Sequence, residues 1–267
     1  MRRNLCLVAA FALAVLPSCR PDTVDLNYRF DEGAEFVYRL HADAQASWDI
    51  GGSGGGTYAV TFEVRERVES TDPTGAVVSV EMTPREVREE GLPAPGSEPR
   101  SFEIRVGQDG EVLEVVEVDG VPAASLDTDE LAFINTYRPK LPVDRVRIAD
   151  TWESQQEVRL GSLFQEIVTV GSLEGLDEDA KGAVAEIGYT GDGPLAWSTT
   201  LPQGEADLRG TGATTGDAVL DLSGGFLRSA ASTTTGTFDV RVAAADGSAP
   251  LTGTLELDLR LTLERIS

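Results

Sequence analysis

The chain has 267 residues, and its 22 Lys and Arg against 45 Asp and Glu give a formal net charge of -23 at pH 7. A hydrophobic content of 41% is enough for a folded core. The negative charge argues against nucleic acid as a partner, because the phosphate backbone would repel the protein. Two cysteines are too few for a disulfide-rich scaffold or a cysteine-based zinc site.

Residues 1–18 have the layout of a secretory signal peptide. Arg2 and Arg3 supply the positive start, and an apolar run follows from Leu5 to Leu16. The run is too short to span a bilayer comfortably, since a transmembrane helix needs about 20 apolar residues. A transmembrane anchor and a buried helix are the alternatives. We expect an exported protein.

The end of this run, Leu16-Pro17-Ser18-Cys19, resembles the bacterial lipobox. The resemblance implies cleavage before Cys19, acylation of Cys19 with chains such as palmitate, and a short tether over residues 19–27. Two acyl chains would anchor the protein stably to a membrane. Arg20 follows the cysteine where an Asp would indicate inner-membrane retention, which favours the outer membrane or cell surface. The alternative is ordinary signal cleavage that leaves Cys19 as an unmodified thiol.

Beyond the signal, apolar and polar residues alternate in long runs, as in half-buried strands. The clearest run is Leu255–Leu263, with Leu at every second position, and Tyr58–Arg65, Phe102–Val106 and Phe238–Ala243 follow the same pattern. Turn sequences such as Asp72–Gly75 separate these runs. The sequence predicts an all-β fold in which long, twisted antiparallel strands form a curved sheet, half-barrel or sandwich.

We expect two similar halves, an N-terminal one over residues 28–126 and a C-terminal one over 143–267. A short central helix after Thr128, ended by Pro139, falls in the intervening helix and linker at 127–142. The similarity indicates an approximate duplication, although any meander of hairpins would look self-similar. We expect loops at the glycine-rich stretch 51–56 and at 91–100.

Three short stretches resemble uncharacterised families of bacterial envelope lipoproteins. They are the expected first strand Tyr28–Gly33, the Leu141-Pro142-Val143 linker followed by Ala149-Asp150-Thr151-Trp152, and the strand and turn Leu220–Gly225. The family usually has Gly in place of Ala149. At fold level the chain is loosely similar to LolA/LppX-type lipoprotein carriers, which implies a curved sheet that holds acyl chains. Fold likeness alone does not transfer function.

The residues offer little catalytic chemistry, and we expect neither an enzyme nor a cofactor. His41 is the single histidine, and no serine lies in a nucleophile elbow. Asp177–Asp179 and Asp192-Gly193 are weak calcium candidates that we interpret as solvated turns, so no metal site is expected. A carboxylate pair for glycoside hydrolysis stays open, because 45 acidic residues will place some pair at a suitable distance.

Two functions therefore compete. The first is a non-catalytic structural or interaction module of the cell envelope with a protein partner. The second is a carrier that binds a lipid or another apolar ligand on the concave face of the sheet, where Leu257, Leu259 and Leu261 are the candidate binding residues. A carrier should contain a large apolar cavity, whereas an interaction module should have a filled core and an exposed edge or patch.

Overall fold

The structure is a computed structural model that describes residues 23–93, 98–125, 138–160, 163–179, 182–201, 204–244 and 249–267. The signal peptide, Cys19 and the expected helix from Thr128 lie outside these residues. No helix long and apolar enough to cross a membrane occurs in the part described. The described elements are β1 (Glu35–Ile50), β2 (Ser53–Asp72), β3 (Gly75–Glu89), β4 (Leu92–Pro93), β5 (Arg100–Gly107), β6 (Val112–Val118), β7 (Val121–Pro122), η1 (Ala123–Ser125), β8 (Thr151–Leu160), β9 (Leu163–Asp179), β10 (Gly182–Leu201), β11 (Gly204–Asp221), β12 (Phe226–Ala244) and β13 (Leu251–Arg265).

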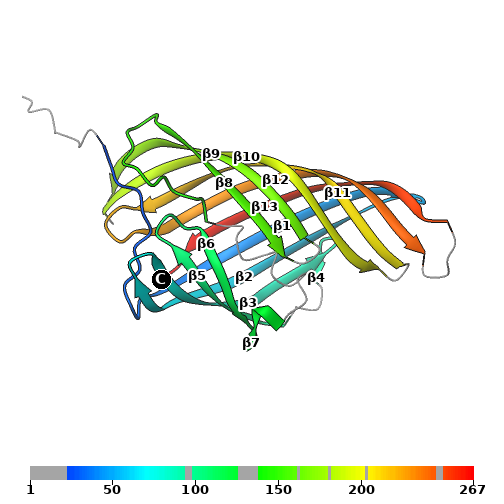
Figure 1. The fold of residues 1–267 in the computed structure, drawn as a ribbon, viewed down its shortest axis with the longest axis horizontal. Coiled ribbons are helices and arrows are strands. Elements are labelled where there is room, and N and C mark those ends of the chain that lie inside the picture. The colour runs from blue at the N-terminus through cyan, green and yellow to red at the C-terminus, as the bar shows by residue number, and fades with distance from the viewer. Residues whose placement is uncertain are drawn as a thin grey trace, which may run out of the picture.

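The strands form one open antiparallel sheet, which confirms the all-β, curved-sheet prediction (Figure 1). The order is β7-β6-β5-β3-β2-β1-β13-β12-β11-β10-β9-β8, with β4 beside β3. In the N-terminal half, successive strands lie progressively farther from β1. In the C-terminal half, successive strands lie progressively closer to β13. Because β1 pairs with β13 along most of its length, the two expected halves are parts of a single sheet. The open edges lie at β8 and at β6 with its short neighbour β7.

The sheet has one apolar and one polar face, as the alternation predicts. The leucines of β13 share a face with their cross-strand partners: Leu263 lies opposite Leu40 and Ala230, and Leu259 lies opposite Ala44. The intervening residues of β13, from Thr252 to Glu264, are polar and point to the other face. The apolar face therefore has to be covered, and the polar face is soluble as it stands.

Two irregular segments cover the apolar face at one end of the sheet. We call residues 23–34 the strap and residues 138–150 the connector. Leu26 and Tyr28 of the strap, and Leu141 and Val146 of the connector, are buried in the main core. Val24 and Val146 join the two segments by a pair of backbone hydrogen bonds of 2.8 and 2.9 Å.

The strap corrects two predictions. The tether expected over residues 19–27 is too long, because Leu26 is buried in the core and Val24 is already bonded to the connector. The expected first strand at Tyr28–Gly33 is also wrong, since these residues cross the end of the sheet and regular pairing begins at Glu35. The apolar residues of the strap were correctly expected to be buried, but as a cover over the sheet.

Several glycines lie within strands because a neighbouring ring occupies the space of a side chain. A Cβ on Gly54 would lie 2.7 Å from the indole of Trp48. Because Gly54 to Gly56 pair within β2, the expected loop at 51–56 is reduced to a turn at Gly51-Gly52. Trp152 covers Gly171 in the same way. Asp192-Gly193, expected in a turn, lies inside β10.

Ala149 has a φ of 73°, a left-handed conformation that costs an alanine about 1–2 kcal/mol. Its N–H donates to the carbonyl oxygen of Leu173 at 2.8 Å, which holds the connector in this conformation where β8 begins. A glycine at this position would adopt the same conformation without that strain.

We therefore expect Ala149→Gly to raise the free energy of unfolding by about 0.5–1 kcal/mol, the relief of strain being partly offset by the greater flexibility of the unfolded chain. Urea denaturation would measure the change. Ala213→Gly, at an exposed position within β11, is the control and should destabilise the protein. A loss of stability in Ala149→Gly would contradict the strain argument.

Candidate functional site

A hollow on the described surface lies between the connector and the beginning of β8. We call it the edge groove. It has a volume of about 850 Å³ and is lined by Asp109, by residues 140–146 of the connector and by residues 149–155. Five consecutive residues of β8 line it although successive side chains point to opposite faces of the sheet. The groove therefore runs along the edge of the strand and not across one face.

The walls of the groove are held in place by specific contacts. Nε1 of Trp152 donates to the carbonyl oxygen of Lys140 at 2.9 Å, which fixes the connector to β8. Nζ of Lys140 lies 2.7 Å from a carboxylate oxygen of Glu111, beyond the turn between β5 and β6. The backbone N–H of Leu141 donates to the carbonyl oxygen of Asp109 at 2.8 Å. The connector thus ties β8 to the opposite side of the curved sheet.

The backbone of β8 has open hydrogen-bonding groups along this groove. The N–H of Leu173 donates to the carbonyl oxygen of Asp150 at 3.1 Å, so Asp150 and Leu173 form a hydrogen-bonded pair. Because such pairs alternate in an antiparallel ladder, the bonds to β9 come from Trp152 and Ser154. The N–H and C=O groups of Thr151, Glu153 and Gln155 then point away from β9. No backbone partner for these three occurs in the described part of the chain.

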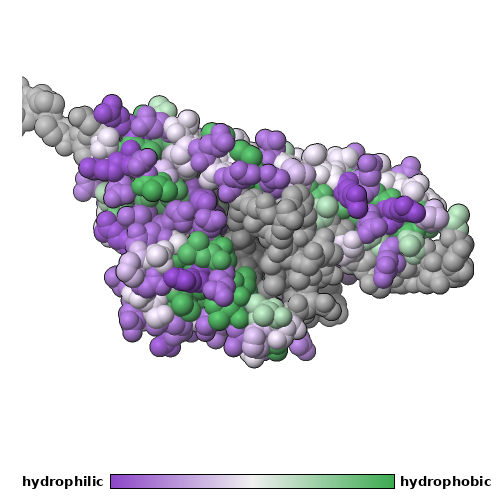
Figure 2. Space-filling model, in the orientation of Figure 1, coloured by the Kyte–Doolittle hydropathy of each residue, from purple (hydrophilic) through white to green (hydrophobic). Residues whose placement is uncertain are grey.

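The opposite edge of the sheet differs. The pairing of β5 with β6 has two register shifts, at Glu103/Ile104 and Arg105/Val106, and such bulges disrupt the regular edge that a further strand needs. The short helix η1 also contacts β6. Hydrophobic residues gather over β5 and β6 in Figure 2, and Leu113, Val116 and Val121 are exposed there. This edge carries an apolar patch.

The far half of the apolar face is the second surface of interest. We call it the distal apolar face and define it by Ala44, Ala46, Trp48, Tyr58, Leu255, Leu257 and Leu259, which share one face by register. Trp48 is 39% and Tyr58 is 42% exposed. At its borders the face joins buried clusters, because Leu255 packs against Leu208 and Val240, and Leu259 packs against Leu261 and Val60.

The three leucines predicted to bind a ligand fall into two environments. Leu257 and Leu259 are half-buried on the distal apolar face. Leu261 is buried beside Ala42 and Val60 and belongs to the packed interior. Next to it, Tyr189, Ala230 and neighbouring residues line a small hollow that is too narrow to admit a water molecule.

A buried ion pair links the sheet to the connector. Glu66 of β2 is only 2% exposed and pairs with Arg138, whose guanidinium also lies 5.9 Å from the ring centre of Tyr28. The hydroxyl of Tyr28 donates to the carbonyl oxygen of Pro139 at 3.1 Å, and burial raises the pKa of Tyr28 above its ordinary value. The sequence analysis did not single out Glu66, although it interrupts the apolar series from Val60 to Val68.

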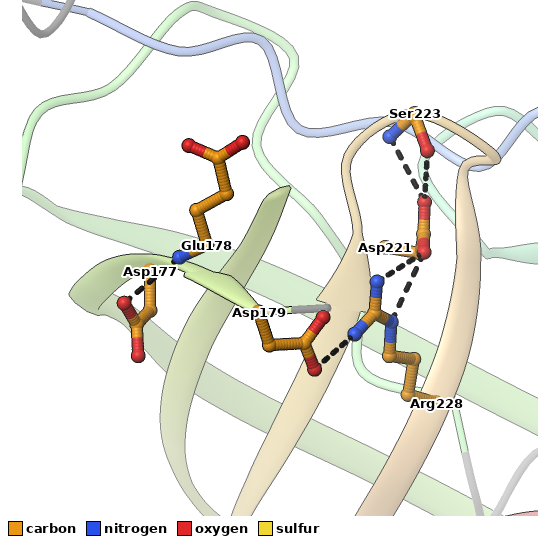
Figure 3. Close-up of polar contacts among 6 residues, drawn as sticks. All are labelled: Asp177, Glu178, Asp179, Asp221, Ser223 and Arg228. Carbon is orange, nitrogen blue, oxygen red and sulfur yellow. Dashed lines mark hydrogen bonds and ion pairs between the residues drawn. The ribbon is translucent and has the colours of Figure 1, made fainter. Parts of the chain in front are cut away.

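A second ionic cluster supports the turn between β11 and β12 (Figure 3). One carboxylate oxygen of Asp221 accepts hydrogen bonds from the N–H groups of Ser223 and Gly224, and the other accepts from Nε and Nη2 of Arg228 at 3.0 and 2.7 Å. Nη1 of Arg228 also lies 2.7 Å from Asp179. Burial alone would raise the pKa of Asp221, but these hydrogen bonds outweigh it and lower the pKa to about 2.

The acidic residues considered for calcium take part in this kind of local bonding. Asp179 pairs with Arg228, and Asp177 accepts a hydrogen bond from the N–H of Glu178. Both lie in β9, not in the expected turn. No group of three potential metal ligands occurs among the described residues. His41, on the polar face, contacts Thr61 and Asp43 at 2.9 Å each.

Comparison with known proteins adds little to this geometry. No family model matches the chain, and no curated protein matches it. Among solved structures, the crystal structure of Pseudomonas aeruginosa OccK11 (OpdR) matches over 90% of this chain and 99% of its own, with 10% sequence identity and a TM-score of 0.23. A likeness at this level defines neither a fold family nor a function.

The Asp221 cluster predicts a pH dependence. Its pKa is about 2 in the folded chain against an ordinary value of 3.8, so its contribution to stability is complete above about pH 5 and is lost as the pH falls through 2. Asp221→Asn should cost about 2–3 kcal/mol at pH 7, because it weakens hydrogen bonds to a charged, largely buried group. Urea denaturation of both proteins should show this difference shrinking between pH 4 and pH 2.

Asp217→Asn is the matched control, since Asp217 is exposed on the same strand. We expect it to change stability by less than about 0.5 kcal/mol at pH 7. A constant difference between Asp221→Asn and the unsubstituted protein at all pH values would refute the titration argument.

Proposed function

We propose that this protein is an exported lipoprotein, anchored through acylated Cys19, and that its curved sheet is a non-catalytic interaction module of the cell envelope. The observation that carries the proposal is the pairing of the first described residues with the connector. Val24 is bonded to Val146, and the carbonyl oxygen of Thr23 accepts a hydrogen bond of 2.9 Å from Arg145. Both contacts lie beside the edge groove.

This arrangement ties the groove to the membrane. Only four residues lie between Cys19 and Val24, and the five steps along the chain span at most about 17 Å when fully extended. The anchored end of the sheet, with its packed core, would therefore stay close to the lipid surface. The opposite end would project outward, because a strand of 20 residues such as β10 is about 65 Å long. Arg20 favours the outer membrane or the cell surface as the location.

A packed core together with exposed edges supports interaction over transport. The hollow beside Leu261 is too narrow for an acyl chain, whereas the edge groove and the patch over β6 are accessible. Such surfaces typically mark contacts with other proteins. The proposal includes no catalytic residue, and His41, on the polar face, contacts a threonine and an aspartate.

Substitution of Cys19 tests the anchor. When the full-length chain is expressed in a bacterium, it should fractionate with membranes, and mass spectrometry should find acyl chains on Cys19. Cys19→Ser should remove the acyl chains and, with them, the membrane association that they supply. Cys6→Ser is the control, because it alters the signal peptide and leaves the acylated residue intact. Membrane association of the Cys19→Ser protein equal to that of the unsubstituted chain would refute the proposal.

The distal apolar face favours a second candidate function, the binding of a lipid or another apolar ligand. Its exposed Trp48 and Tyr58 lie beside the half-buried Leu257 and Leu259, and an apolar surface of this kind is costly to leave in water. An acyl chain laid along the sheet would contact all four side chains. This would be binding to an open face and would not require an enclosed cavity.

Native mass spectrometry of the chain purified from the periplasm, with extraction of bound lipid, tests this second function. A stoichiometric lipid should copurify and should be lost from Leu257→Asn/Leu259→Asn. Leu261 is not suitable for substitution, because its burial would make any loss a matter of folding. Thr254→Asn/Thr262→Asn on the polar face of the same strand should retain the lipid. A protein mass without lipid, and no uptake of added fatty acid or phospholipid, would exclude this function.

A further inference from the structure

We propose that the edge groove receives an extended, basic segment of a partner protein, which adds to the sheet as a strand beside β8. This inference rests on the proposed interaction function and specifies its site and the chemistry of its partner. Strand addition supplies affinity through main-chain hydrogen bonds, and the surrounding side chains select the sequence. Three features of the groove support it: open backbone groups, accessible space and charge.

The backbone groups come first. The outward N–H and C=O groups of Thr151, Glu153 and Gln155 recur at every second residue, which is the spacing that an antiparallel neighbour requires. The register of β8 with β9 has no shift, so the edge is regular, unlike that of β6. The five residues that line the groove span about 16 Å of strand.

The space comes second. The groove has a volume of about 850 Å³ between this edge and the connector. If the connector were paired directly with β8, this gap would not exist. Val143 of the connector is 89% exposed on the far wall and offers an apolar contact to alternate side chains of the incoming segment. Trp152 closes the groove at its base through its bond to Lys140.

The third feature is the negative charge of the groove, which identifies the partner as basic. Four carboxylates line the groove, those of Asp109, Asp144, Asp150 and Glu153, against two cations. Both cations have partners, since Lys140 pairs with Glu111 and with Asp109 of the groove, and Arg145 donates to the carbonyl oxygen of Thr23. Asp144 and Glu153 are exposed and have no ion pair among the described residues. A segment rich in Lys or Arg would therefore be attracted, and an acidic segment repelled.

The test uses a fluorescent eight-residue peptide of alternating Lys and Val and the full chain purified from membranes in detergent. Fluorescence anisotropy at low salt should show saturable binding. The same peptide with alternate backbone nitrogens methylated should bind at least tenfold more weakly, because it cannot complete the ladder. An otherwise identical peptide with Glu in place of Lys should not bind. If the methylated peptide bound equally well, strand addition would be refuted, and charge attraction would be the remaining explanation of the binding.

Substitutions on β8 separate the backbone from the charge. Gln155→Pro removes an outward N–H while leaving the ladder to β9 intact, and we expect at least a tenfold loss of affinity. Gln155→Val retains the N–H and should bind as the unsubstituted chain does. Glu153→Gln should weaken binding about twofold to threefold at low salt and have no effect at high salt. Circular dichroism would verify that each variant is folded.

The outcomes are distinct from those of the anchoring experiment. Absence of saturable peptide binding up to about 1 mM, or unchanged affinity in a folded Gln155→Pro protein, would overturn the strand-addition proposal. Neither result would bear on whether Cys19 is acylated. Conversely, a chain that is not acylated would refute the membrane-anchored function and leave the measured peptide affinity as it is.

Discussion

The structure depends on one constraint: a single-layer sheet with one apolar face must have that face covered. In a sandwich a second sheet would serve, but here the strap and the connector cover the anchored end. Such irregular segments are costly to bury, because their backbone groups need partners. The strap obtains them from the ends of the sheet: Tyr28 N–H donates to the carbonyl of Gln108, and Arg29 N–H donates to that of Gly225. The strap therefore covers the apolar face while its own backbone groups are hydrogen-bonded to the ends of the sheet.

The ion pair of Glu66 and Arg138 adds a position-specific lock to this cover. A buried pair of charges contributes little net stability compared with apolar residues, but the loss of one partner costs about 3–5 kcal/mol. The pair therefore favours the single placement of the connector in which Arg138 reaches Glu66. With Arg138 in place, Pro139 meets Tyr28 and Lys140 meets Trp152, so one placement sets the position of the groove wall.

The sequence predicted the strands well because alternation reports directly which residues face the core. The five leucines of β13 and the series Tyr58 to Val64 lie on the apolar face as expected. It failed where a contact between distant residues decides the outcome. Composition cannot show that a ring of β1 lies on Gly54, or that Leu26 belongs to a cover and not to a tether. For the same reason the edge groove was not predicted, since contacts between distant residues, such as the bond from Leu141 to Asp109, set the position of its walls.

The two edges of this open sheet avoid pairing with a second copy of the chain in different ways, and the acidic charge accounts for one of them. An unpaired regular edge such as β8 invites pairing with a second copy of the chain, which leads to aggregation. In such a pair the carboxylates of Asp144 and Glu153 from both copies would lie close together, and like charges placed across strands are destabilising. The bulges and η1 blunt the edge at β6, whereas charge protects the edge at β8. Protection by charge is selective, because it excludes an identical acidic chain and still admits a basic one.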